Sequence, residues 1–326
     1  MSLALDLPRL QTALRLPAQD ERQKLLHGLL QPQARIDSKY FYDDRGCELF
    51  TAICLLDEYY PTRTEAQIFN QHRDAIAAQL PANMQWIDLG CGDCNKTQSW
   101  LPAISPARVV GVDIAGEFLQ SSLAEVALQH PQLECVGVVT DFTQHLDLDE
   151  LLAERPGAPP VFFYPGSSIG NFEPRAAIRF LRRIRAHCGP DGRLLIGADL
   201  IKPRDVLEAA YDDASGVTAE FNLNVLNVVN RELDADFEPT NFRHFAHFNE
   251  AHRRVEMHLV STRSHSVDLG GHANRQFGAE EHILTEYSHK YSLDELRALL
   301  AASGLRCSQY WTDPQDWFGV FLAEPI

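Results

Sequence analysis

The stretch from about Thr64 to Leu200 alternates strand-like and helix-like patterns, and this alternation constrains the fold more than any other feature of the chain. Short apolar runs of strand length are separated by segments in which apolar residues recur at helical spacing. The expected strands are Trp86–Leu89, Val109–Val112, Leu133–Val139, Val161–Tyr164 and Leu194–Ala198. Regular alternation of this kind predicts an α/β fold with a parallel, doubly wound sheet and right-handed crossovers.

The C-terminal segment is expected to return the chain to this sheet. Ser292 and Glu295 have the spacing of a capping box at the start of a helix, and Gly304 ends that helix. Two strand-like runs follow, Cys307–Thr312 and Trp317–Ala323. A strand pair in this place predicts an addition to the edge of the α/β sheet.

Two other parts of the chain do not continue the alternation. They lie before about Thr62 and between about Lys202 and Ser288. We therefore predict two domains. The doubly wound domain contains residues 62–200 and 289–326, and a smaller domain or lid contains residues 1–61 and 201–288.

Charge and hydropathy limit the classes of partner. The chain has 326 residues and a formal net charge of −16, with a sequence pI near 5.2. Binding to nucleic acid depends on neutralising phosphates, so an acidic chain without a basic run is a poor candidate for it. The longest apolar runs are of strand length, far shorter than a membrane-spanning helix, and no signal-peptide pattern opens the sequence. We expect a cytoplasmic protein with a small-molecule partner, for which a monomer is the favoured oligomeric state.

The cysteines and histidines do not predict a metal centre. Seven scattered cysteines argue against a disulfide framework. Cys91 and Cys94 form a C-x-x-C pair, but no second pair of ligands stands at the spacing of a structural zinc site. Four histidines are interpreted as scattered surface residues: His244, His247, His252 and His258. We expect no metal, and the sequence assigns no role to the cysteine pair.

Residues that follow the first three expected strands suggest a nucleoside site. Ligands of open parallel sheets bind beyond the carboxyl ends of the strands. Gly90 and Gly92 follow the first strand, where glycine lets the backbone turn tightly and approach a ligand. Asp113 ends the second strand, where a carboxylate can accept both hydroxyls of a ribose. Asp141 and Phe142 follow the third strand and could take an adenine amine and the face of the base.

The glycine loop also narrows the choice of cofactor. A dinucleotide fingerprint would require a third glycine where Asn95 stands. A phosphate-binding P-loop would require a glycine before Lys96 and Thr97. S-adenosylmethionine fits best, because it has an adenosine to hold and no pyrophosphate that needs the third glycine.

The sequence resembles the histidine-specific Nα-methyltransferase family, whose best-known members make hercynine for ergothioneine biosynthesis. The resemblance runs from about residue 35 to the C-terminus. It rests on these segments, found in order: Lys39–Asp43 (KYFYD), Asp57–Arg63 (DEYYPTR), Gly166–Phe172 (GSSIGNF), Ala210–Asp213 (AYDD), Gly216–Asn222 (GVTAEFN) and Thr285–Ser288 (TEYS). The residues Cys91-Gly92-Asp93-Cys94 depart from the Ser/Thr-rich loop expected in the family, although the glycines and Lys96 remain.

The resemblance implies a Rossmann-like class I methyltransferase sheet, a second domain that covers the amino acid, and a role for each of thirteen residues. Those implied to bind S-adenosylmethionine are Gly90, Gly92, Lys96, Asp113, Asp141 and Phe142. Those implied to hold the amino acid are Tyr59, Asn171, Tyr211, Met257, Glu286 and Ser288. Tyr42 is implied to lie near the reacting amine as the catalytic residue.

The chemistry of the implied reaction suits these residue types. Methyl transfer from a sulfonium is an in-line displacement, so catalysis depends mostly on aiming a deprotonated amine. Asn171 and Tyr211 can donate hydrogen bonds to a carboxylate without adding a fixed charge. Glu286 and Ser288 stand two positions apart, which in a strand places both on one face, where they could read the two nitrogens of an imidazole.

Structural interpretations stand beside the functional ones. Without the resemblance, Glu286 and Ser288 would be a solvated strand face, Tyr59 and Tyr211 core aromatics, and Asn171 a turn residue. The sequence leaves three rival functions: an Nα-methyltransferase for another amino acid such as a tryptophan derivative, a cofactor-binding protein without catalysis, and a nicotinamide oxidoreductase. The pairing of Glu286 with Ser288 favours histidine over tryptophan, because an indole offers a single donor.

Overall fold

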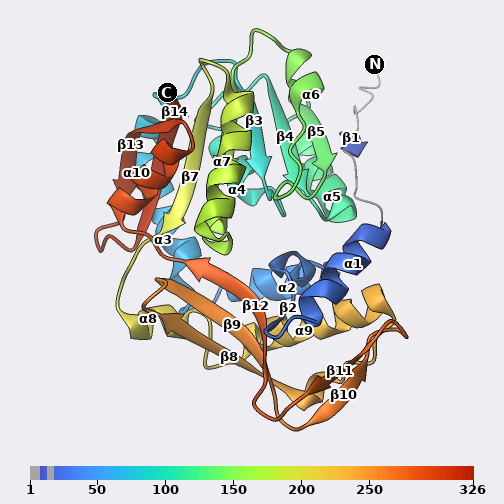
Figure 1. Ribbon diagram of the computed structural model, residues 1–326. Coiled ribbons are helices and arrows are strands. Elements are labelled where there is room, and N and C mark those ends of the chain that lie inside the picture. Colours follow the sequence, from blue (N-terminus) through green and yellow to red (C-terminus); the bar gives the residue numbers. More distant parts are fainter. Residues whose placement is uncertain (1–7, 13–17) are drawn as a thin grey trace. The chain divides into compact units, whose positions relative to one another are not determined.

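The computed structural model describes residues 8–12 and 18–326, which form two compact units (Figure 1). Of these residues, 8–12, 63–200 and 291–326 belong to unit 1, and 18–62 and 201–290 belong to unit 2. Among the described residues, no helix is both long and apolar enough to cross a membrane.

Unit 1 is built on an eight-stranded sheet with the order β1-β5-β4-β3-β6-β7-β14-β13. Its strands are β1 (Arg9–Thr12), β3 (Gln85–Leu89), β4 (Arg108–Asp113), β5 (Glu134–Val139), β6 (Pro160–Tyr164), β7 (Arg193–Asp199), β13 (Leu305–Thr312) and β14 (Phe318–Pro325). The strands from β1 to β7 pair in parallel, and β14 is antiparallel to both β7 and β13. The five strands expected between Thr64 and Leu200 and the C-terminal strand pair are therefore confirmed.

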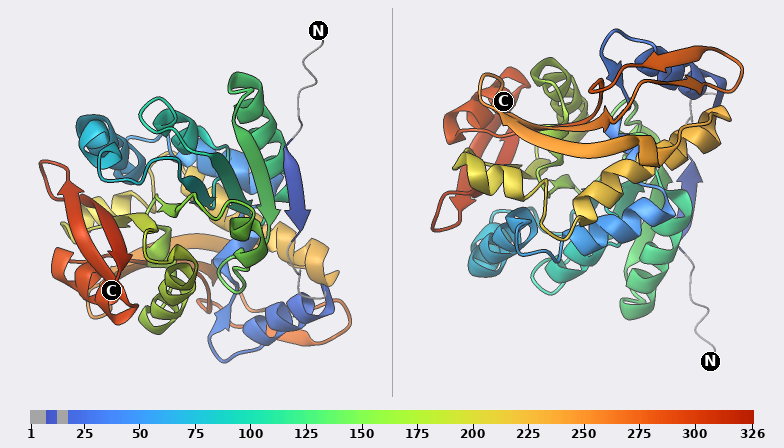
Figure 2. Two further views of the ribbon diagram at one scale, coloured as in Figure 1. Left: turned by 90° about the horizontal axis from the view of Figure 1, so that it is seen from above. Right: turned by 90° about the horizontal axis from the view of Figure 1, so that it is seen from below.

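Helices complete unit 1, as Figure 2 shows from two further directions. They are α3 (Tyr60–Ala77, of which residues 60–62 are in unit 2), α4 (Asn95–Trp100), α5 (Gly116–Gln129), α6 (Asp149–Ala153), η2 (Ser168–Asn171), α7 (Pro174–Cys188) and α10 (Leu293–Ala302). The capping box expected at the start of α10 is formed: Ser292 and Glu295 bond reciprocally.

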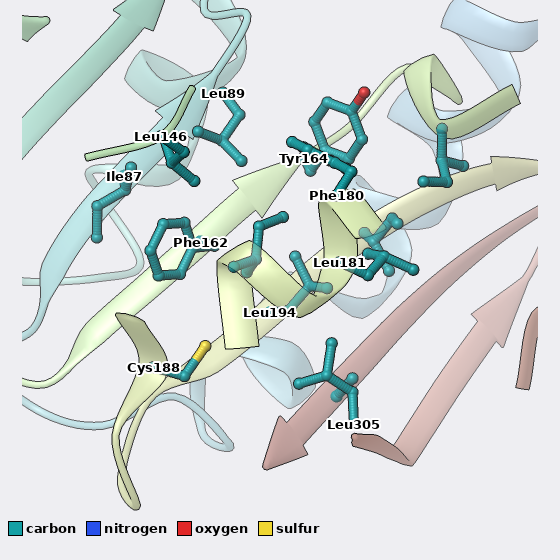
Figure 3. Packing of buried hydrophobic residues seen from close by; sticks show 14 of the residues in the cluster. Ile87, Leu89, Leu146, Phe162, Tyr164, Phe180, Leu181, Cys188, Leu194 and Leu305 are labelled. Carbon is teal, nitrogen blue, oxygen red and sulfur yellow. The ribbon is translucent and has the colours of Figure 1, made fainter. Parts of the chain in front are cut away.

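The parallel strands are buried on both faces, which is why they read as continuous apolar runs. Ile87 and Leu89 contribute to one apolar cluster together with α7 and α10, part of which is drawn in Figure 3. Trp86, which precedes Ile87 and pairs in register with Val161, contributes to the second cluster, which also contains Trp100 of α4. Alternation along β3 thus supplies both cores of a doubly wound sheet.

One predicted boundary is wrong. Residues 1–61 were assigned to the smaller domain, but β1 pairs in parallel with β5 at the edge of the unit 1 sheet. Leu10 packs against the core of unit 1, beside Gly137. A side chain at position 137 would collide with Leu10. This edge strand has four residues and pairs with one neighbour only, so its sequence shows no pattern long enough to predict a strand. Residues 1–7 and 13–17, also within that prediction, lie outside the described part of the chain.

Unit 2 contains a four-stranded sheet, β2-β12-β9-β8, and a separate two-stranded sheet, β10-β11. The strands are β2 (Ala34–Arg35), β8 (Phe242–Asn249), β9 (Arg254–Ser261), β10 (His265–Asp268), β11 (Asn274–Phe277) and β12 (His282–His289). The helices are α1 (Ala18–Leu29), η1 (Ser38–Phe41), α2 (Asp44–Ile53), α8 (Arg204–Ala209), α9 (Val217–Leu233) and η3 (Pro239–Asn241).

The start of α9 is fixed by its own sequence. Gly216 adopts a positive φ of 77°, and the carboxylate of Asp213 accepts hydrogen bonds from the N–H groups of Val217 and Thr218. Further along, the amide of Asn222 donates to His258 O and to His244 Nδ1 and accepts from Thr285. One buried amide therefore holds α9 to β8, β9 and β12.

Not all of the four histidines that were interpreted as surface residues lie at the surface. His252 is exposed, but His258 is buried and the side chain of His244 is almost fully covered. The reason is that β8 and β9 pair along their whole length, so residues spaced irregularly in sequence become neighbours in a sheet.

Candidate active site

The loop after β3 has the backbone that its glycines require. Gly90 and Gly92 have φ values of 73° and 52°, and Cys94, which precedes α4, also has a positive φ of 56°. At Gly90 an added Cβ would meet the ring of Phe142 at 3.5 Å, whereas at Gly92 it would meet nothing within 4 Å. Phe142 therefore packs against the loop, and the loop is open at Gly92.

Asp113 lies at the end of β4 beside this loop. Its two carboxylate oxygens accept hydrogen bonds from Gly92 N at 3.1 Å and Ala115 N at 3.0 Å. Burial raises the pKa of Asp113, and the backbone N–H groups oppose that rise. Each oxygen keeps a further lone pair, so the carboxylate can still accept the two hydroxyls of a ribose.

Asp141 and Phe142 follow β5, the next strand in the sheet. The carboxylate of Asp141 accepts from Thr143 N at 3.1 Å and from Gln144 Nε2 at 2.6 Å, which orients it. Phe142 makes ring contacts with Tyr164 and Phe180. Three neighbouring strands thus deliver the glycines, Asp113 and the Asp141–Phe142 pair to one edge of the unit 1 sheet, as predicted from their positions.

Lys96 in the first turn of α4 is held by a carboxylate that the sequence does not single out. Its Nζ lies 2.6 Å from Oε2 of Glu65, and Oε1 of the same residue accepts from Gly166 N at 2.7 Å. Glu65 is 1% exposed and comes from α3. It therefore joins α4 to the loop after β6, at the same edge of the sheet as the glycine loop.

Asn171 ends η2, which follows that loop in unit 1. Ser167 precedes η2 with a φ of 62°, and its hydroxyl accepts from Asp199 N at 2.8 Å. These contacts fix the segment that carries Asn171. The other residues predicted to hold the amino acid belong to unit 2.

In unit 2, Tyr42 and Tyr59 belong to a group of contacting aromatic rings. Both rings meet Phe50 edge to face, with centroids 5.8 and 6.2 Å away, and Tyr42 also meets Phe221 of α9. Tyr59 in turn meets Tyr211 at 6.3 Å. Burial, with nearby acidic groups including Tyr211 and Glu286, raises the pKa of Tyr59 well above its ordinary value, so its phenol stays protonated.

Tyr211 and Ser288 are linked through a buried lysine. Their hydroxyl oxygens are 2.7 Å apart, and Nζ of Lys290 donates to both, at 2.9 Å and 2.8 Å respectively. The ammonium also lies 4.6 Å from the centroid of the Tyr211 ring. Lys290 is 2% exposed. A positive charge is thus fixed behind two hydroxyls that were predicted to touch the amino acid.

Glu286 and Ser288 lie on one face of β12, as their spacing predicts. The strand has a bulge between Leu284 and Glu286, after which Glu286 pairs with Met257 of β9. Burial raises the pKa of Glu286 to about 7, and the charge of Lys290 opposes the rise. Glu286 is therefore not the fully solvated strand residue of the structural interpretation.

Two charged residues of the site were missed by the sequence analysis. Lys290 stands two positions after Ser288, and the same strand spacing that paired Glu286 with Ser288 could have indicated it. Glu65 gives no local signal, because its partners Lys96 and Gly166 come from segments distant in sequence.

The sequence is similar to those of known methyltransferases. The model of a family of histidine-specific, S-adenosylmethionine-dependent methyltransferases matches residues 21–325. A histidine N-alpha-methyltransferase of Mycolicibacterium smegmatis is 38% identical over 93% of this chain and 94% of its own. One of Mycobacterium tuberculosis is 37% identical over the same shares. An L-tryptophan methyltransferase of Psilocybe serbica is 26% identical over 90% of this chain and 89% of its own.

The sheet order, the glycine loop and the strand-end acids define a class I S-adenosylmethionine-dependent methyltransferase. The match over residues 21–325 makes the assignment narrower. This chain belongs to the family of histidine-specific, S-adenosylmethionine-dependent methyltransferases.

Proposed function

We propose that this protein transfers methyl groups from S-adenosylmethionine to the α-amino nitrogen of L-histidine, and that three transfers give the betaine hercynine. The observation that carries the proposal is the placement of Glu286 and Ser288 on one face of β12, with Lys290, the residue just after the strand, donating to Ser288. A carboxylate and a hydroxyl on one face suit the two nitrogens of an imidazole. The similarity to histidine N-alpha-methyltransferases supports the same substrate.

The methyl donor is assigned to unit 1. S-adenosylmethionine supplies a sulfonium methyl group for in-line displacement. Gly90 and Gly92 admit the donor close to the backbone, Asp113 takes the ribose hydroxyls, and Asp141 with Phe142 holds the adenine. Lys96, oriented by Glu65, stands at the same loop.

The amino acid is assigned to Tyr42, Tyr59, Tyr211, Met257, Glu286 and Ser288 of unit 2, with Asn171 of unit 1. Tyr211 is the group for the substrate carboxylate, and Lys290 behind it strengthens any hydrogen bond that Tyr211 donates. Glu286 in its ionised form accepts from an imidazole N–H. Tyr42 is the residue placed nearest the amine. Together with water, it can receive the proton that the amine loses before methyl transfer.

Trimethylation is proposed because aromatic rings can hold the product of each step. A methylated ammonium loses its hydrogen-bond donors as methyl groups are added, but its attraction to an aromatic face remains. The rings of Tyr42 and Tyr59 both contact Phe50, which keeps them within one aromatic group. They can hold the mono-, di- and trimethylated amine in turn.

A competition experiment tests the choice of substrate. The purified protein is given a limiting amount of S-adenosylmethionine and an equimolar mixture of the proteinogenic amino acids, and the masses of all products are measured. The proposal expects methylated histidine to take up nearly all of the methyl groups. Preferential methylation of another amino acid would overturn it.

The alternative substrate class is an indole amino acid, favoured by the similarity to an L-tryptophan methyltransferase. Glu286 together with Ser288 decides between the two, because an imidazole offers two ring nitrogens to this pair and an indole offers a single N–H donor. Replacing Glu286 by Ala should therefore relax discrimination against tryptophan and phenylalanine. Equal selectivity in the variant and the parent would mean that Glu286 does not read the side chain.

A further inference from the structure

A cluster of histidine and glutamate side chains lies on one face of the unit 2 sheet, away from the residues assigned to the substrate. His247 of β8 pairs across the ladder with Glu256 of β9, and His258 follows two positions along β9. Because side chains alternate along a strand, these three project from the face opposite to that of Met257. Nε2 of His258 lies 3.4 Å from Oε2 of Glu256, and Nε2 of His247 lies 3.9 Å from the same oxygen.

The buried imidazole nitrogens of this cluster lack hydrogen-bond partners. His258 is 7% exposed, yet neither of its ring nitrogens makes a hydrogen bond, and Nδ1 of His247 is also buried and unsatisfied. Leaving such groups unpaired is costly, so each one calls for a physical explanation. A cation bound beside Glu256 would satisfy Nε2 of His258, the unpaired nitrogen that lies 3.4 Å from Oε2 of that carboxylate.

Glu256 is oriented as metal-binding carboxylates usually are. Its Oε1 accepts from Arg254 Nε at 2.7 Å and from Asn249 Nδ2 at 3.1 Å. These bonds leave Oε2 turned toward the two imidazoles. Outer partners that fix the orientation of a ligand in this way are typical of metal sites.

We propose that His247, Glu256 and His258 form a binding site for a divalent transition-metal ion of the zinc class, which clips β8 to β9. Within residues 8–12 and 18–326, they are the one group of three or more His, Cys, Asp or Glu side chains whose donor atoms all lie within 4.8 Å of one another. Tetrahedral Zn²⁺ with ligands at about 2.0–2.1 Å needs donor atoms roughly 3.4 Å apart, a spacing that small ring rotations reach. Two imidazoles and a carboxylate favour such an ion over Ca²⁺ or Mg²⁺ and leave a fourth position for water.

Metal titration of the untagged, chelator-treated full-length protein tests the site, since a polyhistidine tag would itself bind the probe. Zn²⁺ affinity is measured by competition with a chromophoric chelator, and Co²⁺ is added separately to record its visible absorption. We expect one equivalent of Zn²⁺ per chain, a Co²⁺ spectrum of low coordination number, and a higher Tm with Zn²⁺. Affinity for S-adenosylhomocysteine should not change, because the cluster faces away from the substrate residues.

The variants Glu256→Gln and His247→Gln should each weaken Zn²⁺ binding by at least about tenfold and abolish the rise in Tm. Glu256→Gln nearly preserves the shape of the side chain, so it separates loss of a ligand from loss of the fold. The matched control is His252→Gln, which removes an exposed histidine from the turn between the same two strands. Absence of saturable binding by the parent, or equal binding by the parent and both cluster variants, would overturn the proposal.

Discussion

The role proposed for Glu286 predicts that the binding of histidine depends on pH. Its folded pKa, about 7, is raised by burial above the ordinary glutamate value. If the ionised form accepts the imidazole N–H, histidine is bound productively above that pH and poorly below it. The sequence predicts the residue and its partner Ser288 from a two-residue spacing, but not this pKa, which depends on burial by segments distant in sequence.

The prediction compares the parent with Glu286→Gln, which cannot ionise. The ratio of their kcat/KM values for histidine should fall about tenfold from pH 8 to pH 6, because the ionised fraction at a pKa of about 7 falls by that factor. Titration of the substrate itself affects both proteins and cancels in the ratio. Glu250→Gln, an exposed acid in the turn after β8, is the control. A ratio that is flat with pH would contradict the role given to Glu286.

Lys290 provides a second test of the same group. Its positive charge favours the ionised form of Glu286, so Lys290→Met should move the pH limb of kcat/KM for histidine to a higher pH. Lys290→Arg keeps the charge and should keep the limb where the parent has it. Full pH profiles of the three proteins make the comparison. An unmoved limb in Lys290→Met would show that the lysine only supports the packing of Tyr211 and Ser288.

Asp113 is the residue assigned to the ribose of the methyl donor. Replacing it by Ala removes the proposed acceptor for the ribose hydroxyls, each bond being worth about 1 kcal/mol or more when desolvated. We expect the Kd for S-adenosylhomocysteine, measured by calorimetry, to rise by about one to two orders of magnitude. Asp93→Ala is the control, because Asp93 is exposed and bonds to Asn95 in the same loop. Equal affinity of Asp113→Ala and the parent would remove Asp113 from the site.

At the scale of elements, β3 and α4 are joined by a short chain of buried polar groups. Trp86 Nε1 donates to the hydroxyl of Thr97 at 2.8 Å, and that hydroxyl donates to Oδ2 of Asp88 at 2.6 Å. Burial raises the pKa of Asp88 to about 7, although the bond from Thr97 and the charge of Lys96 oppose the rise. The loop that carries Gly90 and Gly92 is thus anchored at both ends.

This pKa predicts how stability depends on pH. Between the ordinary aspartate pKa and about 7 the folded protein keeps a proton that the unfolded chain loses, so stability falls as the pH rises through that range. The Asp88→Asn variant lacks this dependence and should gain on the parent by up to about 1.4 kcal/mol per pH unit. Urea unfolding of both proteins without ligand, from pH 5 to pH 8, measures the difference. The control is Asp191→Asn, at an exposed aspartate in the turn before β7. A constant difference would contradict the prediction.

The elements differ in how well the sequence predicts them. The five parallel strands of the core, buried on both faces, have apolar runs that stand out from their surroundings, and α10 has a complete capping box. The edge strand β1 has neither feature, and its pairing with β5 joins residues more than a hundred positions apart. The bulge in β12 is likewise set by pairing with β9, so no local pattern indicates it.

In the molecule as a whole, the proposed functional residues are divided between two units. Unit 1 carries the residues assigned to the methyl donor, and unit 2 carries most of those assigned to the amino acid. The two-part organisation could be predicted because the alternation of strands and helices stops near Thr62 and Lys202. The role of each residue could be inferred only through the resemblance, since tyrosines and glutamates in these positions also suit a purely structural role.

Methylation of histidine on its α-nitrogen can be tested through the chemical structure of the product. Histidine and an excess of S-adenosylmethionine are incubated with the protein to completion, and the product is examined by tandem mass spectrometry. We expect a trimethylated histidine that loses trimethylamine on fragmentation, with the imidazole unmodified. A methyl group on the imidazole ring, or a final product that stops at one methyl group, would contradict it.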